Sequence, residues 1–216
     1  MTKQDDQTPE KAVEQVKVDL RDPIWAALLG WLWPGAGHLY QRRYAKGALF
    51  MVCILSTYFY GLALGDGHVV YASWRPNDYR WQYFCQLGTG IPAFPAMVQA
   101  IKVNRGGAPF FVTREFETDQ FPKMRDLKMT GTLQEGFMAP PPGPIFPNDD
   151  DVLAIWHGEL KHRFEIATLY TVVAGLLNLL AVYDAFAGPA LPLEKRPEED
   201  SPPDGEQESG TGARRR

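Results

Sequence analysis

Cysteine is scarce in this sequence. Only two cysteines, Cys53 and Cys85, occur in 216 residues, and both lie within apolar stretches. They do not have the spacing of a zinc or redox motif, and two isolated residues do not form a disulfide framework. Each cysteine is therefore interpreted as a small buried apolar side chain.

Three further features are missing. The formal net charge is only −4, and no basic stripe with interleaved aromatic residues occurs, so we do not expect nucleic-acid binding. Residues 1–22 are highly charged and lack the short apolar run of a cleavable signal peptide, so the first apolar block should remain in the mature protein. No Ser/His/Asp set, glycine-rich phosphate loop or usable carboxylate pair stands out, so no enzyme activity, cofactor or metal is predicted.

Apolar residues are nevertheless abundant, and they are grouped in four blocks. The mean hydropathy is slightly negative, but insertion into a membrane depends on this grouping rather than on the average. The blocks predict an all-α fold, a helical integral membrane protein with three or four membrane helices. The expected segments are a polar N-terminal segment 1–22, a membrane hairpin 23–65, an external loop 66–81, a kinked membrane helix 82–101, a cytoplasmic and partly irregular segment 102–163, a membrane helix 164–188 and a disordered tail 189–216.

The first apolar block leaves two alternatives open. Asp22 and Pro23 predict a helix start, with the aspartate as N-cap and the proline in the first turn. The eleven residues from Pro23 to Trp33 would span only about 16 Å, which is roughly half of a bilayer's hydrocarbon core. Either the helix continues through Pro34 to Tyr40 and crosses, or the chain enters halfway and turns back. The side on which the N-terminus lies depends on this choice.

The second and fourth blocks are long enough to cross a membrane. Residues 46–65 and 164–187 are each predicted to form one transmembrane helix, and Gly188 should end the latter. Small and hydrogen-bonding residues at spacings of three and four should let neighbouring helices approach closely. The predicted packing residues are Gly61, Gly65, Thr171, Gly175 and Asn178. Asp184, near the helix end, is expected to cap the helix or pair with an arginine.

The third block, residues 82–101, contains two prolines, Pro92 and Pro95, and is predicted to be a kinked membrane helix packed on the second block. An alternative is a broken helix that lines a transport path, with Gln86 and Gln99 and with His38 from the first hairpin.

Basic residues suggest an orientation. Lys and Arg flank the first hairpin turn and both ends of segment 102–163, so the positive-inside rule places the turn and this segment in the cytoplasm. Loop 66–81 and the C-terminal tail would then lie outside. Within the cytoplasmic segment, residues 139–144 should form an extended proline-rich spacer or a ligand for a partner, and an amphipathic helix should follow with Asn148 or Asp149 as its cap.

The first hairpin resembles a known family. Its turn contains a Pro-Gly-x-Gly-His-x-Tyr pattern, a basic pair and a Lys46-Gly47 step, and these residues resemble the two-transmembrane-hairpin domain of small bacterial membrane proteins. The turn residues are Pro34, Gly35, Gly37, His38, Tyr40, Arg42 and Arg43. The sequence departs from the family at Arg42, where glycine is usual. The resemblance implies a membrane hairpin and helix association, and it implies no catalysis.

Together these features predict a multi-pass protein of a bacterial inner membrane that acts as a structural, interaction or assembly component. Its partners would be the lipid bilayer and either another protein or a second copy bound through the membrane helices. The alternative function is a small transporter or channel subunit.

Overall fold

The structure, a computed structural model, describes residues 22–146 and 151–188. Within them the chain is mostly helical, with two sheets of two strands each. The predictions made for residues 1–21, for the tail 189–216 and for a helix cap at Asn148 or Asp149 fall outside the described residues.

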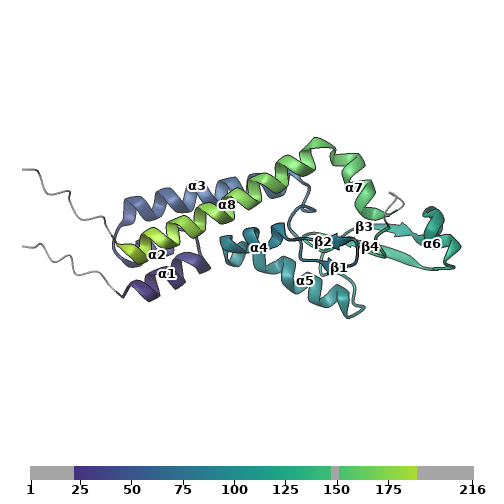
Figure 1. Ribbon diagram of the computed structural model, residues 1–216, viewed down its shortest axis with the longest axis horizontal. Helices are drawn as coiled ribbons and strands as arrows, with labels where there is room; N and C mark the ends of the chain where they lie inside the picture. Colours follow the sequence, from purple (N-terminus) through teal and green to yellow (C-terminus); the bar gives the residue numbers. More distant parts are fainter. Residues whose placement is uncertain (1–21, 147–150, 189–216) are drawn as a thin grey trace, which may run out of the picture.

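The long helix α8, His162–Ala187, is the element on which the other apolar helices pack. Helix α3, Tyr44–Leu64, runs antiparallel to it along most of its length (Figure 1). Helix α1, Pro23–Leu32, and helix α4, Gln82–Gln86, also pack against α8, one toward each end. Asp22 accepts a hydrogen bond from the Ile24 backbone N–H at 3.0 Å, which confirms the predicted N-cap of α1.

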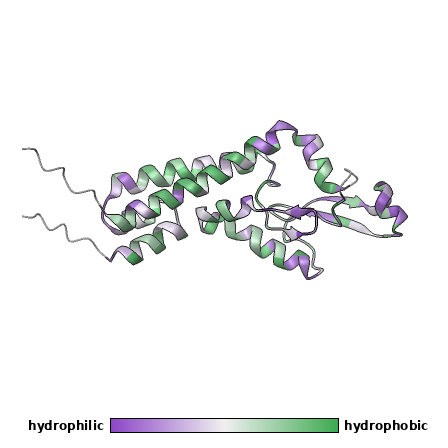
Figure 2. Ribbon diagram, in the orientation of Figure 1, coloured by the Kyte–Doolittle hydropathy of each residue, from purple (hydrophilic) through white to green (hydrophobic). Residues whose placement is uncertain are grey.

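Helices α3 and α8 are long and apolar enough to cross a membrane, and much of their apolar surface is exposed. Only 28% and 39% of their most apolar windows are buried within the chain. The exposed large side chains include Leu49, Val52, Phe59, Leu169, Leu180 and Tyr183. Figure 2 shows this apolar end of the molecule and the more polar end beyond it. Cys53 is exposed on α3, so its predicted burial within the protein is wrong.

The first apolar block turns back on itself. Helix α1 ends at Leu32, the chain bends through Gly35 at φ +80°, and the short helix α2, Ala36–Tyr40, returns beside α1. The approach is close enough that a Cβ added at Gly37 would overlap the carbonyl oxygen of Ala26. The helix therefore does not continue through Pro34 to Tyr40, and the chain turns back there.

The third apolar block also forms a hairpin, so the prediction of one kinked helix over residues 82–101 is wrong. Helix α4 continues as the 3-10 turn η1, Leu87–Thr89, and the chain then reverses at Gly90, which has φ +80°. The turn η2, Ile91–Ala93, leads into α5, Phe94–Asn104, which runs back toward the polar end (Figure 1). The Tyr83 hydroxyl donates to the Ala93 carbonyl at 2.9 Å and holds the two arms together.

Because this block reverses, the predicted orientation of the loops changes. Arg75 donates to the carbonyl oxygens of Pro141 and Gly143, and Asn77 donates to that of Ile145. Segments 66–81 and 102–163 therefore lie together, and the prediction that a membrane separates them is wrong. The first hairpin turn and the end of α8 lie at the opposite end of the molecule from these segments (Figure 1).

Residues 66–81 and 105–161 fold together, and we call them the polar module. Its core contains Phe116, Phe121, Met124 and Trp156. Its elements are β1 (Trp74–Arg75), β2 (Asp78–Tyr79), β3 (Val112–Glu117), η3 (Thr118–Gln120), α6 (Pro122–Asp126), β4 (Thr132–Gly136) and α7 (Val152–Leu160). Strands β1 and β2 pair antiparallel, as do β3 and β4, the latter pair with an irregularity between Val112 and Arg114.

Candidate functional site

The predicted packing residues on α3 and α8 face each other within the chain. A Cβ added at Gly61 would lie 2.8 Å from the Tyr170 Cβ and 2.9 Å from the Thr171 Cγ2, and one added at Gly65 would lie 3.1 Å from the Ala167 Cβ. The small residues thus let α3 and α8 approach closely. This face is already occupied, so it is not free for a second copy of the chain.

Gly175 and Asn178 of α8 contact the α1–α2 and α4–α5 hairpins. A Cβ added at Gly175 would overlap the Cys85 carbonyl oxygen, so α4 crosses α8 at this glycine. The fully buried Asn178 amide donates to the Gly30 carbonyl of α1 at 3.1 Å and to the Gly88 carbonyl of η1 at 2.9 Å. Both carbonyls lie at C-terminal helix ends, where backbone acceptors lack partners within the helix. Asn178 therefore joins the tips of the α1–α2 and α4–α5 hairpins.

The predicted turn residue His38 binds the other end of α8. Its Nε2 lies 2.7 Å from Asp184 Oδ2, and the Lys46 ammonium donates to the same oxygen at 2.7 Å. Arg43 approaches this oxygen at 3.6 Å, so the prediction of an arginine partner for Asp184 is confirmed. His38 is only 1% exposed. This cluster fastens the first hairpin to the end of α8 and leaves the imidazole no open face for a ligand.

The remaining turn residues shape the bend. Pro34 follows Trp33, the C-cap of α1. Gly35 has a left-handed backbone and packs against Gly47, whose carbonyl oxygen a Cβ added at Gly35 would overlap. Arg42 also has a left-handed backbone, with φ 63°. Glycine adopts this conformation without steric cost, whereas a residue with a Cβ rarely does. Tyr40 ends α2 and is half-buried.

A polar cavity in the module was not predicted from the sequence. Its volume is about 280 Å³, and it lies where the loop after α3 meets β3, β4 and α7. Its lining residues are Asp66, His68, Thr113, Arg114, Glu135, Trp156, Glu159 and Leu160. Sequence spacing could not reveal it, because these residues come from four distant segments and none belongs to a motif.

Glu135 is the buried acceptor at the centre of this cavity wall. The Thr113 hydroxyl donates to Oε1 at 3.1 Å, and the Trp156 indole N–H donates to Oε2 at 2.8 Å. His68 Nε2 lies 3.2 Å from Oε1. Glu135 is 2% exposed. Both of its oxygens are engaged, so the carboxylate joins β3, β4 and α7 to the loop that carries His68.

Charged groups around the cavity perturb one another. The His68 ring stacks on Trp156 at 4.6 Å, and its burial lowers the pKa of the imidazole although the Glu135 charge opposes that shift. Arg114 donates to both oxygens of Glu159, at 2.9 and 3.0 Å, and these hydrogen bonds lower the pKa of that carboxyl.

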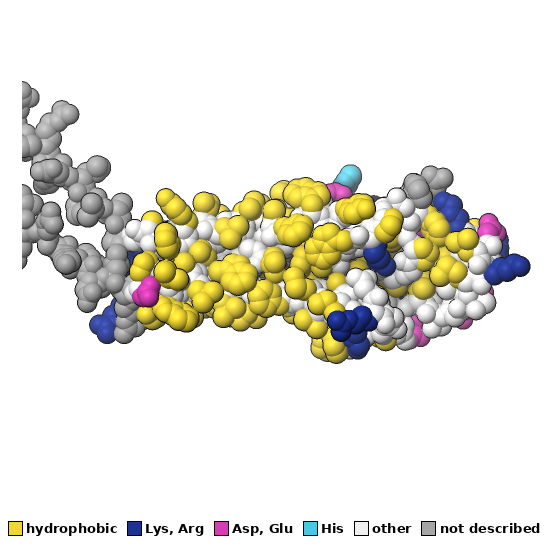
Figure 3. Space-filling view, turned by 60° about the horizontal axis from the view of Figure 1, so that its bottom comes forward, with side chains coloured by type: hydrophobic (Ala, Val, Ile, Leu, Met, Phe, Trp, Pro, Cys, Tyr) yellow, Lys and Arg dark blue, Asp and Glu magenta, His cyan; other side chains and the backbone are white. Residues whose placement is uncertain are grey.

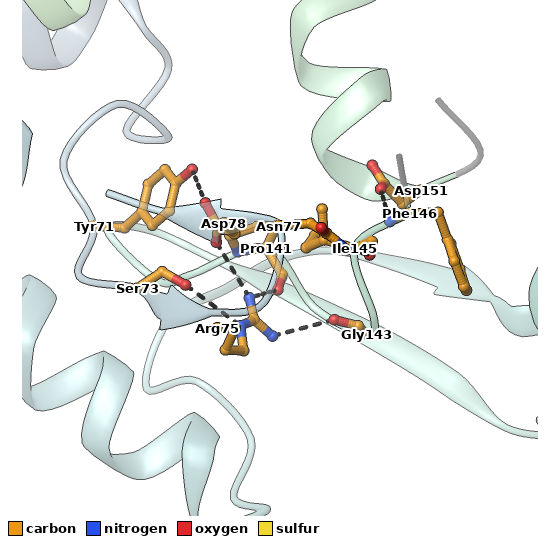
Figure 4. A network of polar contacts seen from close by, with 10 residues as sticks. All are labelled: Tyr71, Ser73, Arg75, Asn77, Asp78, Pro141, Gly143, Ile145, Phe146 and Asp151. Carbon is orange, nitrogen blue, oxygen red and sulfur yellow. Dashed lines mark hydrogen bonds and ion pairs between the residues drawn. The ribbon is translucent and has the colours of Figure 1, made fainter. Parts of the chain in front are cut away.

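The proline-rich stretch 139–144 is held inside the module. Figure 4 shows the Arg75 guanidinium reaching the carbonyl oxygens of Pro141 and Gly143 while it faces Asp78. The Tyr71 hydroxyl donates to Asp78 at 3.1 Å. Pro140, Pro141 and Pro142 are buried, so this stretch is not exposed as a ligand for a partner.

Asp151 closes the same network (Figure 4). Its Oδ2 accepts from the Phe146 N–H at 2.7 Å, and its Oδ1 accepts from the Ala154 N–H at 2.9 Å. Asp151 is therefore the N-cap of α7.

Residues 25–198 match a sequence family described as a family of unknown function, DUF6677. The chain belongs to the DUF6677 family. No curated protein and no solved structure matches it. The match spans both long apolar helices, the α4–α5 hairpin and the polar module of this DUF6677 protein.

The residues nominated for a transport path lie apart in the DUF6677 protein. Gln86 donates to the Val69 carbonyl at 3.0 Å and to the Thr171 hydroxyl at 2.8 Å. Gln99 binds the polar module, and His38 binds Asp184 at the opposite end of α8. Each side chain holds two segments together. Among the described residues of the DUF6677 protein, no group of three His, Cys, Asp or Glu side chains could hold a metal ion.

The stability of the module of this DUF6677 protein should depend on pH through His68. Its folded pKa lies below the ordinary value of about 6.5, so the unfolded chain binds the proton more readily as the pH falls. The free energy of unfolding should therefore be highest above about pH 7 and should decrease as the pH drops below about 6.5. Thermal unfolding in detergent at pH values from about 8 to 5.5 measures this. His68→Gln should flatten the dependence, whereas His157→Gln, at an exposed position of α7, should retain it; equal slopes for both variants would contradict the role of His68.

Proposed function

We propose that this protein is a multi-pass protein of a bacterial inner membrane that acts as an interaction or assembly component, with the polar module as its cytoplasmic contact surface. Helices α3 and α8 cross the bilayer. The α1–α2 and α4–α5 hairpins enter it from opposite sides, and their tips meet at Asn178.

The observation that carries the proposal is the apolar surface of α3 and α8. The core helices of a soluble protein would be mostly buried. Only 28% of the most apolar window of α3 and 39% of that of α8 are buried, so both helices expose many apolar side chains. The polar backbone at the hairpin tips is meanwhile bonded internally through Asn178, as irregular backbone at membrane depth requires. The resemblance of the Pro34–Tyr40 turn to the hairpins of bacterial membrane proteins also supports the proposed location in a bacterial membrane.

The arrangement of charge favours a cytoplasmic module. Basic residues flank two of its connections to the apolar helices, with Lys102 in the last turn of α5, Arg105 directly after it, and Lys161 and Arg163 at the start of α8. At the other end of the molecule, Lys46 and Arg43 approach the Asp184 carboxylate.

An interaction role follows from a comparison of the surfaces that the apolar helices and the polar module expose. The small-residue faces of α3 and α8 are occupied within the chain, so partner binding through them would require the helices to separate. The module, in contrast, exposes the β3 strand and the apolar Leu127 after α6. Protein contacts are therefore assigned to the module and lipid contacts to the helices.

Cysteine labelling tests the topology. In a chain without Cys53 and Cys85, single cysteines at the exposed positions Arg42, Tyr79 and Lys128 report on the turn, the β1–β2 hairpin and the α6 tip. An impermeant maleimide should label positions 79 and 128 from one side of the membrane and position 42 from the other. Labelling of positions 42 and 128 from the same side would contradict this topology and would indicate that the α4–α5 segment crosses the membrane.

Site-specific photo-cross-linking tests the interaction role. A photoreactive residue at Leu127, 62% exposed on the module, is compared with one at Leu180, 65% exposed on α8. We expect protein adducts from position 127 and lipid adducts from position 180. Adducts to a second copy from position 180, with none from position 127, would instead indicate self-association through α8.

A further inference from the structure

The return arm α5 carries an apolar groove on the outside of the molecule. The groove has a volume of about 440 Å³ and is lined almost wholly by apolar side chains, including Phe94, Val98, Phe110, Phe111 and Phe137. Its size is typical of ligand pockets, which measure roughly 300–1,000 Å³. Phe111 is 68% exposed, although burial is usual for a phenylalanine in a soluble domain.

The groove is built into the fold. The Gln99 amide donates to the Phe137 carbonyl at 3.0 Å, and its oxygen accepts from the Phe110 N–H at 2.9 Å. Gln99 is 3% exposed, so one buried side chain binds α5 to both segments that form the opposite wall. The walls are therefore fixed before any ligand arrives.

A positively charged hollow continues from this groove. Val98 lines both, and the second hollow, of about 320 Å³, also includes Ile101, Lys102 and Arg105. The Lys102 ammonium lies 3.8 Å from the centre of the Phe110 ring, at the end of the apolar surface. Figure 3 shows dark blue Lys and Arg side chains at the lower border of a broad hydrophobic band.

The positive charge of this hollow has no acidic counterpart nearby in the chain. No Asp or Glu occurs between residues 82 and 114. None of the ion pairs found among the described residues includes Lys102 or Arg105. A ligand that matches both hollows therefore needs a long apolar portion and, beside it, an anionic group.

We propose that α5 binds one anionic glycerophospholipid, whose acyl chain lies in the groove along Val98 and Phe111 and whose phosphate is bound by Lys102 and Arg105. The inference rests on the proposed membrane location. It adds a lipid site with headgroup preference to the apolar lipid contacts proposed for α3 and α8.

The test uses the full chain reconstituted in nanodiscs of phosphatidylglycerol and phosphatidylcholine and then released into mild detergent for native mass spectrometry. The wild-type protein should retain phosphatidylglycerol in preference to phosphatidylcholine. Each basic residue near an anionic lipid contributes about fivefold, so Lys102→Gln with Arg105→Gln should weaken retention of phosphatidylglycerol about 30-fold. Arg125→Gln with Lys128→Gln removes the same charge from the far tip of the module and should change nothing.

A second variant tests the acyl portion. Val98→Trp fills the junction of the two hollows and should reduce the retention of both lipids, while the thermal midpoint shows that the protein remains folded. Equal retention of both lipids by the wild type, or equal losses from the two charge variants, would overturn the inference. A protein that fails to enter nanodiscs of any composition would instead contradict the proposed membrane location.

Discussion

Replacement of Asn178 by leucine should lower the thermal midpoint of the protein in detergent by about 6–12 °C. Leucine has the same number of side-chain heavy atoms and the same branching but no amide, so the carbonyls of Gly30 and Gly88 would stay buried without donors. An unsatisfied buried acceptor costs about 1–3 kcal/mol, and two of them should reduce the free energy of unfolding by about 3 kcal/mol. Both hairpin tips should also become more accessible to proteases.

Leu180→Ala is the matched control for this change. Leu180 lies on the same helix but is 65% exposed, so its truncation leaves no buried polar group and no cavity. We expect a shift of the midpoint below about 2 °C. Similar midpoints for the Asn178→Leu and wild-type proteins would mean that water or other groups satisfy the two carbonyls.

Gly175→Ala should be at least as damaging. The added methyl group would overlap the Cys85 carbonyl oxygen. Its next neighbours are also backbone atoms, Cys85 C at 2.9 Å and Gln86 Cα at 3.3 Å. Backbone atoms cannot rotate away as a side chain can, so α4 would have to leave α8. We expect a loss of about 3 kcal/mol in the free energy of unfolding, measured from thermal or denaturant unfolding.

A glycine-to-alanine substitution in α7 distinguishes the effect of close packing on stability from the effect of helix propensity. Gly158 lies in a helix with no atom within 4 Å of an added Cβ. Gly158→Ala should therefore leave stability unchanged or raise it by about 0.5–1 kcal/mol, because alanine loses less backbone entropy than glycine. If both variants behave alike, close approach of α4 and α8 is not the reason for glycine at position 175.

The parts of the fold that depend on local sequence could be predicted. The two long helices were placed within two residues of their observed starts, because uninterrupted apolar runs of that length have few alternatives. The Asp22 cap and the end of α8 at Gly188 are likewise short-range features. The packing residues were identified from their size, although their partners were not.

The parts that depend on distant segments could not be predicted. Pro92 and Pro95 suit a kinked helix as well as a hairpin, and the reversal at Gly90 is decided by the tip of α1, whose Trp31 carbonyl lies where a Cβ of Gly90 would be. That one reversal brings loop 66–81 together with segment 102–163, which the sequence had placed on opposite sides of the membrane. The contact between His68 and Glu135 joins two segments that no motif connects.

The position of Asn178 has a consequence for the synthesis of the chain. Its amide binds carbonyls that lie 148 and 90 residues earlier, so both hairpins leave the ribosome well before their donor exists. During this interval the carbonyls at the two tips need other partners, such as water. The tips can therefore be joined only when the last apolar helix arrives, and a chain cut short before α8 should be recognised by quality-control proteases as unfinished.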